Sequence, residues 1–233
     1  MDIKNKKKNL TKDELLVDYI KDQLEEKMQA SSMDINVSCR DGSVQLSGFV
    51  DVLSEKQYAE KVARSVDSVR KVENSITIGV DSNITDKHME KEIIDKLSES
   101  KDANRIVGVG VQVNDGVANL VGEVDTLKDA HIAMNLSAQT RGIKDVVNNT
   151  KVVTADAIDD ITINNSIQQQ LNESERIRAK DIVTDVKNGI VTLMGYANNR
   201  YESELAKEIS MSTLGVKKVR NMISLRKNNE SKQ

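Results

Sequence analysis

Residues 41–48 read Asp-Gly-Ser-Val-Gln-Leu-Ser-Gly, and related stretches follow at two later places in the chain. In each copy the second glycine lies six residues after the first, and an asparagine lies 32 residues after the first glycine. The residues that define the copies are Asp41, Gly42, Gly48 and Asn74, then Asp115, Gly116, Gly122 and Asn148, and finally Asn188, Gly189, Gly195 and Asn221. A period of 74 and then 73 residues predicts three small domains, because a unit of that length can bury a core of its own.

The composition is that of an ordinary soluble protein, with 38% hydrophobic and 30% charged residues among 233. A net charge of -3 provides no general attraction to nucleic acid, so we expect no nucleic-acid partner. The single cysteine, Cys39, cannot form an intramolecular disulfide. No apolar run approaches the roughly 18 residues of a membrane span, so we expect no transmembrane segment.

The first segment, residues 1–12, predicts a disordered basic arm, because lysines outnumber acids there and no apolar period is present. Its lysines include Lys4, Lys6, Lys7 and Lys8. Such an arm either keeps the chain soluble or rests on an anionic surface. The arm has no apolar core of a signal peptide, so we expect a cytoplasmic protein, or a periplasmic one if the true start lies upstream. Residues 228–233 are predicted to be a disordered tail.

The first copy predicts a helix, two strands, a second helix and a last strand. A spacing of four puts Leu16, Ile20 and Leu24 on one helix face, and Ile35, Val37 and Cys39 alternate as in a half-buried strand. The pair Asp41-Gly42 is typical of a tight hairpin turn. A glycine inside the returning strand, Gly48, indicates a bulge or a close backbone contact. The second helix is expected to start at Ser54 as its N-cap.

This order of elements, the Asp-Gly-x-Val-x-Leu-x-Gly hairpin of residues 41–48 and the Gly-Val-x-x-Val-x-Asn ending of residues 215–221 together resemble the BON domain. That family is named for bacterial OsmY and nodulation proteins. The resemblance covers residues 13–80, 86–154 and 160–227, and implies three tandem α+β domains of order αββαβ. Each would pack a small three-stranded mixed sheet with two helices. Residues 117–120 depart from the pattern and are expected to shift the strand of the second copy.

The resemblance also implies a non-catalytic module. BON domains occur in envelope and osmotic-stress proteins, where phospholipid binding is the usual proposal. Other members are associated with potassium sensing or with chaperone-like behaviour. No ligand residues define all of these activities, so none is carried over to this chain.

The residues alone offer little for catalysis or cofactor binding. His88 and His131 lie on predicted exposed helix faces without a partner at ligand spacing, and Cys39 is expected to be a small core residue. We therefore expect no enzyme, no metal site and no cofactor. One acidic cluster, Asp156, Asp159 and Asp160, is a candidate for cation binding, although acids at a helix start are also favoured by the helix dipole.

Two aromatic residues are candidates for surface binding. Phe49 and Tyr196 occupy the same position after the second glycine in the first and third copies, where the second copy has Glu123. They either anchor a partner or lipid surface, or pack on a neighbouring domain. The sequence therefore predicts a tandem BON protein that binds phospholipid or an envelope component in osmotic-stress protection. The alternatives are a cytoplasmic ion or small-ligand sensor and a chaperone-like protein-binding module.

Overall fold

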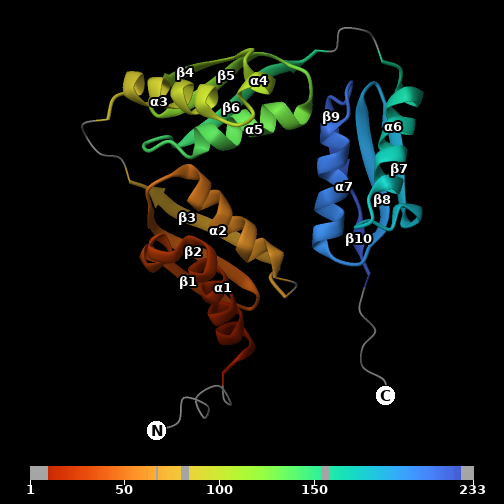
Figure 1. Ribbon diagram of the computed structural model, residues 1–233. Coiled ribbons are helices and arrows are strands. Elements are labelled where there is room, and N and C mark those ends of the chain that lie inside the picture. Colours follow the sequence, from red (N-terminus) through yellow and green to blue (C-terminus); the bar gives the residue numbers. More distant parts are fainter. Residues whose placement is uncertain (1–9, 67, 80–83, 154–157, 227–233) are drawn as a thin grey trace, which may run out of the picture. The chain divides into compact units, whose positions relative to one another are not determined.

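The computed structural model describes residues 10–66, 68–79, 84–153 and 158–226, which form three domains (Figure 1). The first domain contains, in chain order, α1 (Lys12–Met28), the short helix η2 (Gln29–Asp34), β1 (Ile35–Arg40), β2 (Ser43–Val50), α2 (Leu53–Ser65) and β3 (Lys71–Ile78). The second contains α3 (Asp86–Glu99), α4 (Ala103–Ile106), β4 (Val109–Asn114), β5 (Val117–Val124), α5 (Leu127–Ala138) and β6 (Asp145–Val152). The third contains α6 (Asp160–Glu173), η3 (Ala179–Asp181), β7 (Ile182–Lys187), β8 (Ile190–Ala197), α7 (Arg200–Ser212), β9 (Lys218–Asn221) and β10 (Ser224–Leu225).

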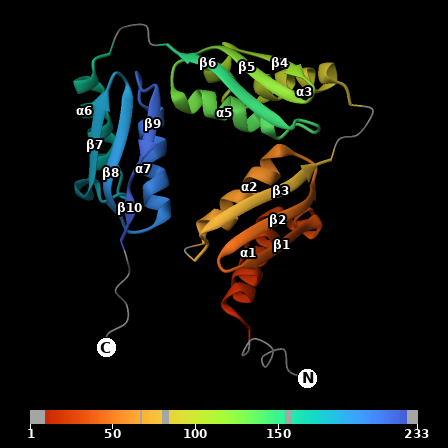
Figure 2. The ribbon, with the colours of Figure 1, turned by 180° about the vertical axis from the view of Figure 1, so that it is seen from behind.

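Each domain has its own mixed sheet, as predicted. β1 runs antiparallel to β2 and β2 runs parallel to β3, and the second domain has the same strand order in β4, β5 and β6. In the third domain the last strand is divided into β9 and β10, which both pair parallel with β8. Two helices cover one face of the sheet in the first and third domains and leave the other face open (Figures 1 and 2). The predicted αββαβ order is confirmed.

The cores lie between helices and sheet, and the predicted helix spacing accounts for them. Ile20, Ile93 and Ile167 hold equivalent places on the first helix of each domain, and none is exposed. A small residue on the second helix, Ala59, Ala133 or Ala206, is also fully buried. A larger side chain there would separate the helix from the sheet.

Two local predictions were wrong. The second helix of the first domain begins at Leu53 rather than after Ser54, because the backbone N–H groups of Asp51 and Val52 bind the Glu55 carboxylate at 3.0 and 3.3 Å. The strand of residues 117–120 is not shifted. Ala118 and Leu120 are fully buried, since they hold the inward places of Val44 and Leu46.

The second glycine of each copy allows a close approach between strand and backbone. Gly48, Gly122 and Gly195 have φ angles of 123°, 115° and 106°. A Cβ at these positions would lie 1.9, 2.0 and 2.1 Å from the carbonyl oxygen of the residue that precedes the first strand. The expected close contact is therefore confirmed in all three domains.

An aspartate at the start of each first helix holds the hairpin turn of its domain. The carboxylate of Asp13 accepts hydrogen bonds from the backbone N–H groups of Asp41 (2.7 Å) and Gly42 (3.1 Å). Equivalent bonds join Asp86 to Asp115 (2.8 Å) and Gly116 (3.0 Å), and Asp160 to Asn188 (2.7 Å) and Gly189 (2.9 Å). One side chain thus joins the first helix to the sheet in each domain.

Replacement of Gly122 by alanine is expected to destabilise the second domain by about 3 kcal/mol, because strain at a positive φ adds to a clash with backbone. Gly110→Ala is the matched control, since its Cβ would meet only ordinary contacts of 3.4 Å and more in the same domain. Chemical denaturation with hydrogen exchange followed over residues 84–153 would measure both. Equal stability of the two variants would contradict the close-contact interpretation.

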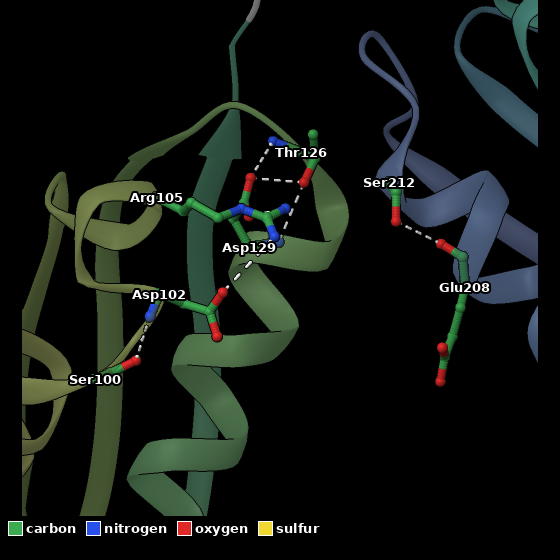
Figure 3. Close-up of polar contacts among 7 residues, drawn as sticks. All are labelled: Ser100, Asp102, Arg105, Thr126, Asp129, Glu208 and Ser212. Carbon is green, nitrogen blue, oxygen red and sulfur yellow. Dashed lines mark hydrogen bonds and ion pairs between the residues drawn. The ribbon is translucent and has the colours of Figure 1, made fainter.

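Asp160→Ala is expected to lower the free energy of unfolding of the third domain by about 2 kcal/mol, because two turn N–H groups lose a charged acceptor. Glu208→Ala is the control. It removes the same charge from α7, where the carboxylate extends away from the helix while the carbonyl oxygen accepts from Ser212 Oγ (Figure 3). Thermal unfolding without added cations measures both variants. A loss no larger than that of the control would show that the carboxylate does not hold the turn.

Candidate functional site

The repeat-defining turn residues are placed by backbone geometry. Asp41 and Gly42 both have positive φ angles, 51° and 75°, and the two other turns repeat this pair. Positive values at both central residues favour glycine and aspartate or asparagine, and match the twist of the flanking strands. The turn carbonyl oxygens of Gly42, Gly116 and Gly189 each accept a bond of 2.8 Å. The donors are the N–H groups of Arg70, Lys144 and Lys217, which directly precede the last strand.

The repeat-defining asparagines join the last strand to the second helix. The Oδ1 atoms of Asn74, Asn148 and Asn221 each accept from the N–H two residues further on, at 3.2, 3.0 and 3.1 Å. In the first and third domains Nδ2 donates to a helix carbonyl oxygen, that of Lys56 (3.0 Å) or Ser203 (3.3 Å). These contacts give the repeated asparagine a structural role, so its recurrence needs no role in ligand binding.

The only cysteine, Cys39, lies beside the Asp13 carboxylate, which binds the hairpin turn of the first domain. Cys39 Sγ donates to Asp13 Oδ1 at 3.3 Å. Burial raises the pKa of the Cys39 thiol, and the neighbouring Asp13 carboxylate raises it further. A thiol with a raised pKa stays protonated at neutral pH, whereas a nucleophile must be a thiolate.

The same contacts lower the pKa of Asp13. The backbone N–H of Asp41 is the main cause, followed by the N–H of Gly42 and the Cys39 thiol. A lowered pKa means that the folded state favours the charged carboxylate. The stability that Asp13 contributes is therefore present above its ordinary pKa of 3.8, and is lost as the pH falls through the lower folded-state value.

Two of the three candidate cation ligands bind backbone groups. Asp159 is the N-cap of α6, and its Oδ1 accepts from the N–H groups of Ile161 and Thr162, both at 2.9 Å. The N–H and then the hydroxyl of Thr162 lower the pKa of Asp159. Asp160 holds the turn of its domain, as described above, and Asp156 lies outside the described residues. Cation binding by this cluster stays a prediction.

The two histidines are exposed, His88 on α3 and His131 on α5. Across the described residues, no group of three histidine, cysteine, aspartate or glutamate side chains is arranged to hold a metal ion. No helix in the same part of the chain is long and apolar enough to cross a membrane.

A second set of acids, which the sequence analysis missed, joins the second helix to the segment before the first strand. Glu55 Oε1 accepts from Ser31 Oγ at 2.6 Å, and Glu202 Oε1 accepts from the N–H of Arg178 at 2.5 Å. In the second domain Asp129 is only 2% exposed and forms an ion pair with Arg105, with 2.7 Å between Oδ1 and Nη2 (Figure 3). Its Oδ2 accepts from the N–H (3.0 Å) and the hydroxyl (2.6 Å) of Thr126.

Both sets of acids left a signal in the repeats. The acids Glu55, Asp129 and Glu202 all follow the second glycine of their copy by seven residues. The aspartates at the first helix precede the first glycine by 29, 30 and 29 residues, so one extra residue in the second copy breaks the alignment. An alignment that allowed one insertion would have identified both sets.

A shallow pocket of about 380 Å³ lies where α1 meets the hairpin turn of the first domain. It is lined by Leu16 and polar residues, including Lys12, Asp13, Asp41 and Arg70. Because Asp13 is already bonded to the turn, Lys12, Arg70 and Asp41 are the remaining charged groups of the lining. At the position of Thr11, the second and third domains have Ile84 and Ile158.

The candidate surface-binding aromatics are both exposed. Phe49 near the end of β2 is 65% exposed, and Tyr196 at the same place in β8 is 57% exposed. Each neighbours a polar residue on the adjacent parallel strand, Thr77 beside Phe49 and Ser224 beside Tyr196. The arm lysines Lys4, Lys6, Lys7 and Lys8 lie outside the described residues, so the structure does not place them relative to these aromatics.

Comparison with known proteins agrees with this repeated architecture. The family model of the BON domain matches residues 12–80, 85–154 and 159–227, close to the predicted boundaries. Osmotically-inducible protein Y of Escherichia coli (strain K12) is 27% identical over 158 residues, which cover 63% of this chain and 76% of that protein.

Similarity to solved structures is weak. CdsD, a structural protein of the type III secretion system of Chlamydia trachomatis, is 18% identical with a TM-score of 0.27, over 91% of this chain and 92% of that chain. The PrgH periplasmic domain is 15% identical with a TM-score of 0.23, over 83% and 95%. The family match covers nearly the whole chain in three consecutive copies, so the chain belongs to the BON domain family and is related to an osmotically inducible protein.

Proposed function

We propose that this protein is a non-enzymatic binding protein that attaches to anionic phospholipid surfaces in osmotic-stress protection. The observation that carries the proposal is the exposed aromatic residue at one repeated strand position, Phe49 in the first domain and Tyr196 in the third. Phe49 and Tyr196 alternate with the buried residues Val50 and Ala197 along their strands, so both lie on the sheet face opposite the core. Helices do not cover that face in the first and third domains (Figure 2). An aromatic ring that is exposed to solvent on one side is well suited to the boundary between lipid headgroups and acyl chains.

The repeated domains add to this proposal through avidity. Each site on a single domain would be weak, because one exposed aromatic ring buries little surface. Two such sites on one chain convert the second binding event into an intramolecular one, so a continuous surface is bound more tightly than a single small ligand. The basic arm would add electrostatic attraction to acidic headgroups.

The relationship to Osmotically-inducible protein Y supports the link to osmotic stress. The other hypotheses from the sequence, an ion or small-ligand sensor, an envelope-protein ligand and a chaperone-like module, stay predictions, as does the cytoplasmic location. Phospholipid is preferred here because the exposed aromatics recur, whereas Asp159 and Asp160 are occupied by backbone donors.

The double variant Phe49→Thr/Tyr196→Thr is expected to bind vesicles containing phosphatidylglycerol about tenfold more weakly than the wild type, since partial burial of two rings is worth at least about 1.4 kcal/mol. Threonine retains strand preference, so the fold should persist. Co-sedimentation with the vesicles measures the binding.

Tyr19→Ala is the matched control, because this tyrosine is 53% exposed on helix α1 rather than on a sheet. Its binding should equal that of the wild type. A wild-type chain that binds neither phosphatidylglycerol vesicles nor neutral phosphatidylcholine vesicles would refute the proposed function.

A further inference from the structure

The open sheet face of the third domain carries different side chains from that of the first domain. The strand register assembles four rows of outward side chains across this face. In order along the sheet, the rows are Lys187, Ile190 and Lys218; Asp185, Thr192 and Arg220; Val183, Met194 and Met222; and Tyr196 and Ser224. Met222 is placed beside Met194 because the flanking pairs Leu193–Asn221 and Tyr196–Ser224 keep the same offset.

One half of this face is apolar. Val183 is 56% exposed, Met222 is 64% exposed and Tyr196 is 57% exposed, while Met194 between them is half-buried. The equivalent row in the first domain, given by the same register, is polar throughout and consists of Asn36, Ser47 and Ser75. The third domain therefore has a contiguous apolar patch where the first domain has only Phe49.

The other half of the face is basic. It holds Lys187, Lys218 and Arg220 against a single acid, Asp185, which lies 3.0 Å from Lys187. Within the described residues, Lys218 and Arg220 have no ion pair. The rows are about 7 Å apart, because alternate residues of a strand point to the same side, so basic and apolar halves together extend over roughly 20 Å.

We propose that this sheet face, the apolar row Val183, Met194 and Met222 with Tyr196 and the adjoining cations, is the main surface by which the chain binds an anionic phospholipid bilayer. This inference rests on the proposed function and assigns it to one domain. A sheet face with an apolar half and a basic half offers contacts both for acyl chains and for acidic headgroups. Methionine and tyrosine side chains adapt to such a boundary at low cost.

The charges of this face favour an anionic bilayer over a second copy of the same face as the binding partner. Face-to-face pairing of two third domains with parallel strands would bring Lys187, Lys218 and Arg220 of one copy near the same cations of the other, and like charges at an interface oppose association. Pairing with antiparallel strands would separate the cations of the two copies and give none of them an acidic partner. Acidic headgroups supply the opposite charge. The bilayer is therefore the occupant that the arrangement of charges favours.

The test uses the full chain and a triple variant, Val183→Asn/Met194→Ser/Met222→Ser. It gives the third domain the residues that the first domain has at these positions, so folding should be preserved, as circular dichroism and thermal unfolding would verify. Binding to phosphatidylglycerol vesicles should fall about tenfold. The control triple Met33→Ser/Val107→Asn/Ile161→Asn removes side chains of η2, the end of α4 and α6 that are 85%, 87% and 74% exposed, and should bind like the wild type.

A second variant examines the basic half. Lys218→Gln/Arg220→Gln should weaken binding by about fivefold or more for each charge removed, and the loss should shrink at high salt. If both variants bind the vesicles as tightly as the wild type, the assignment to this face is overturned and the proposed function stands. A wild type that binds no vesicle would overturn the proposed function and the inference with it.

Discussion

The hydrogen bonds between a helix aspartate and a hairpin turn are the interaction on which each domain depends. A two-residue turn with positive φ angles directs its N–H groups outward, where they need an acceptor. Asp13, Asp86 and Asp160 provide that acceptor from the first helix. The bonds fix the first helix against the sheet face on which the apolar residues of the central strand are buried, and the other face stays uncovered.

Most of the fold could be predicted because its determinants are local. Turn glycines, alternating strand residues and a helical spacing of four are visible in a single copy, and three copies remove ambiguity. The start of α2 was missed because the acceptor that caps it, Glu55, lies within the helix rather than before it. The turn-binding aspartates were missed because each lies almost 30 residues from its turn, and only folding brings the two together.

The candidate site was predicted only in part, for a related reason. Tyr196 could be identified from its place in the repeat, since it directly follows a marker glycine. Val183 and Met222 are 39 residues apart, and nothing in their immediate surroundings connects them. They become neighbours of Met194 through strand register, which depends on the central strand pairing with both β7 and β9. A surface assembled from three strands is a property of the sheet rather than of any one segment.

The ion pair between the buried carboxylate of Asp129 and the exposed guanidinium of Arg105 bears on how related domains in one chain avoid misfolding. Neighbouring domains of the same fold can exchange equivalent elements while they fold. If the corresponding segment of the first domain took the place of α4, the buried carboxylate of Asp129 would lose its guanidinium partner, which is unfavourable. Ser31, at the corresponding place four residues before the first strand of its domain, carries no charge, whereas the third domain has Arg178 there. The second domain therefore has a chemical means of rejecting this segment of the first domain.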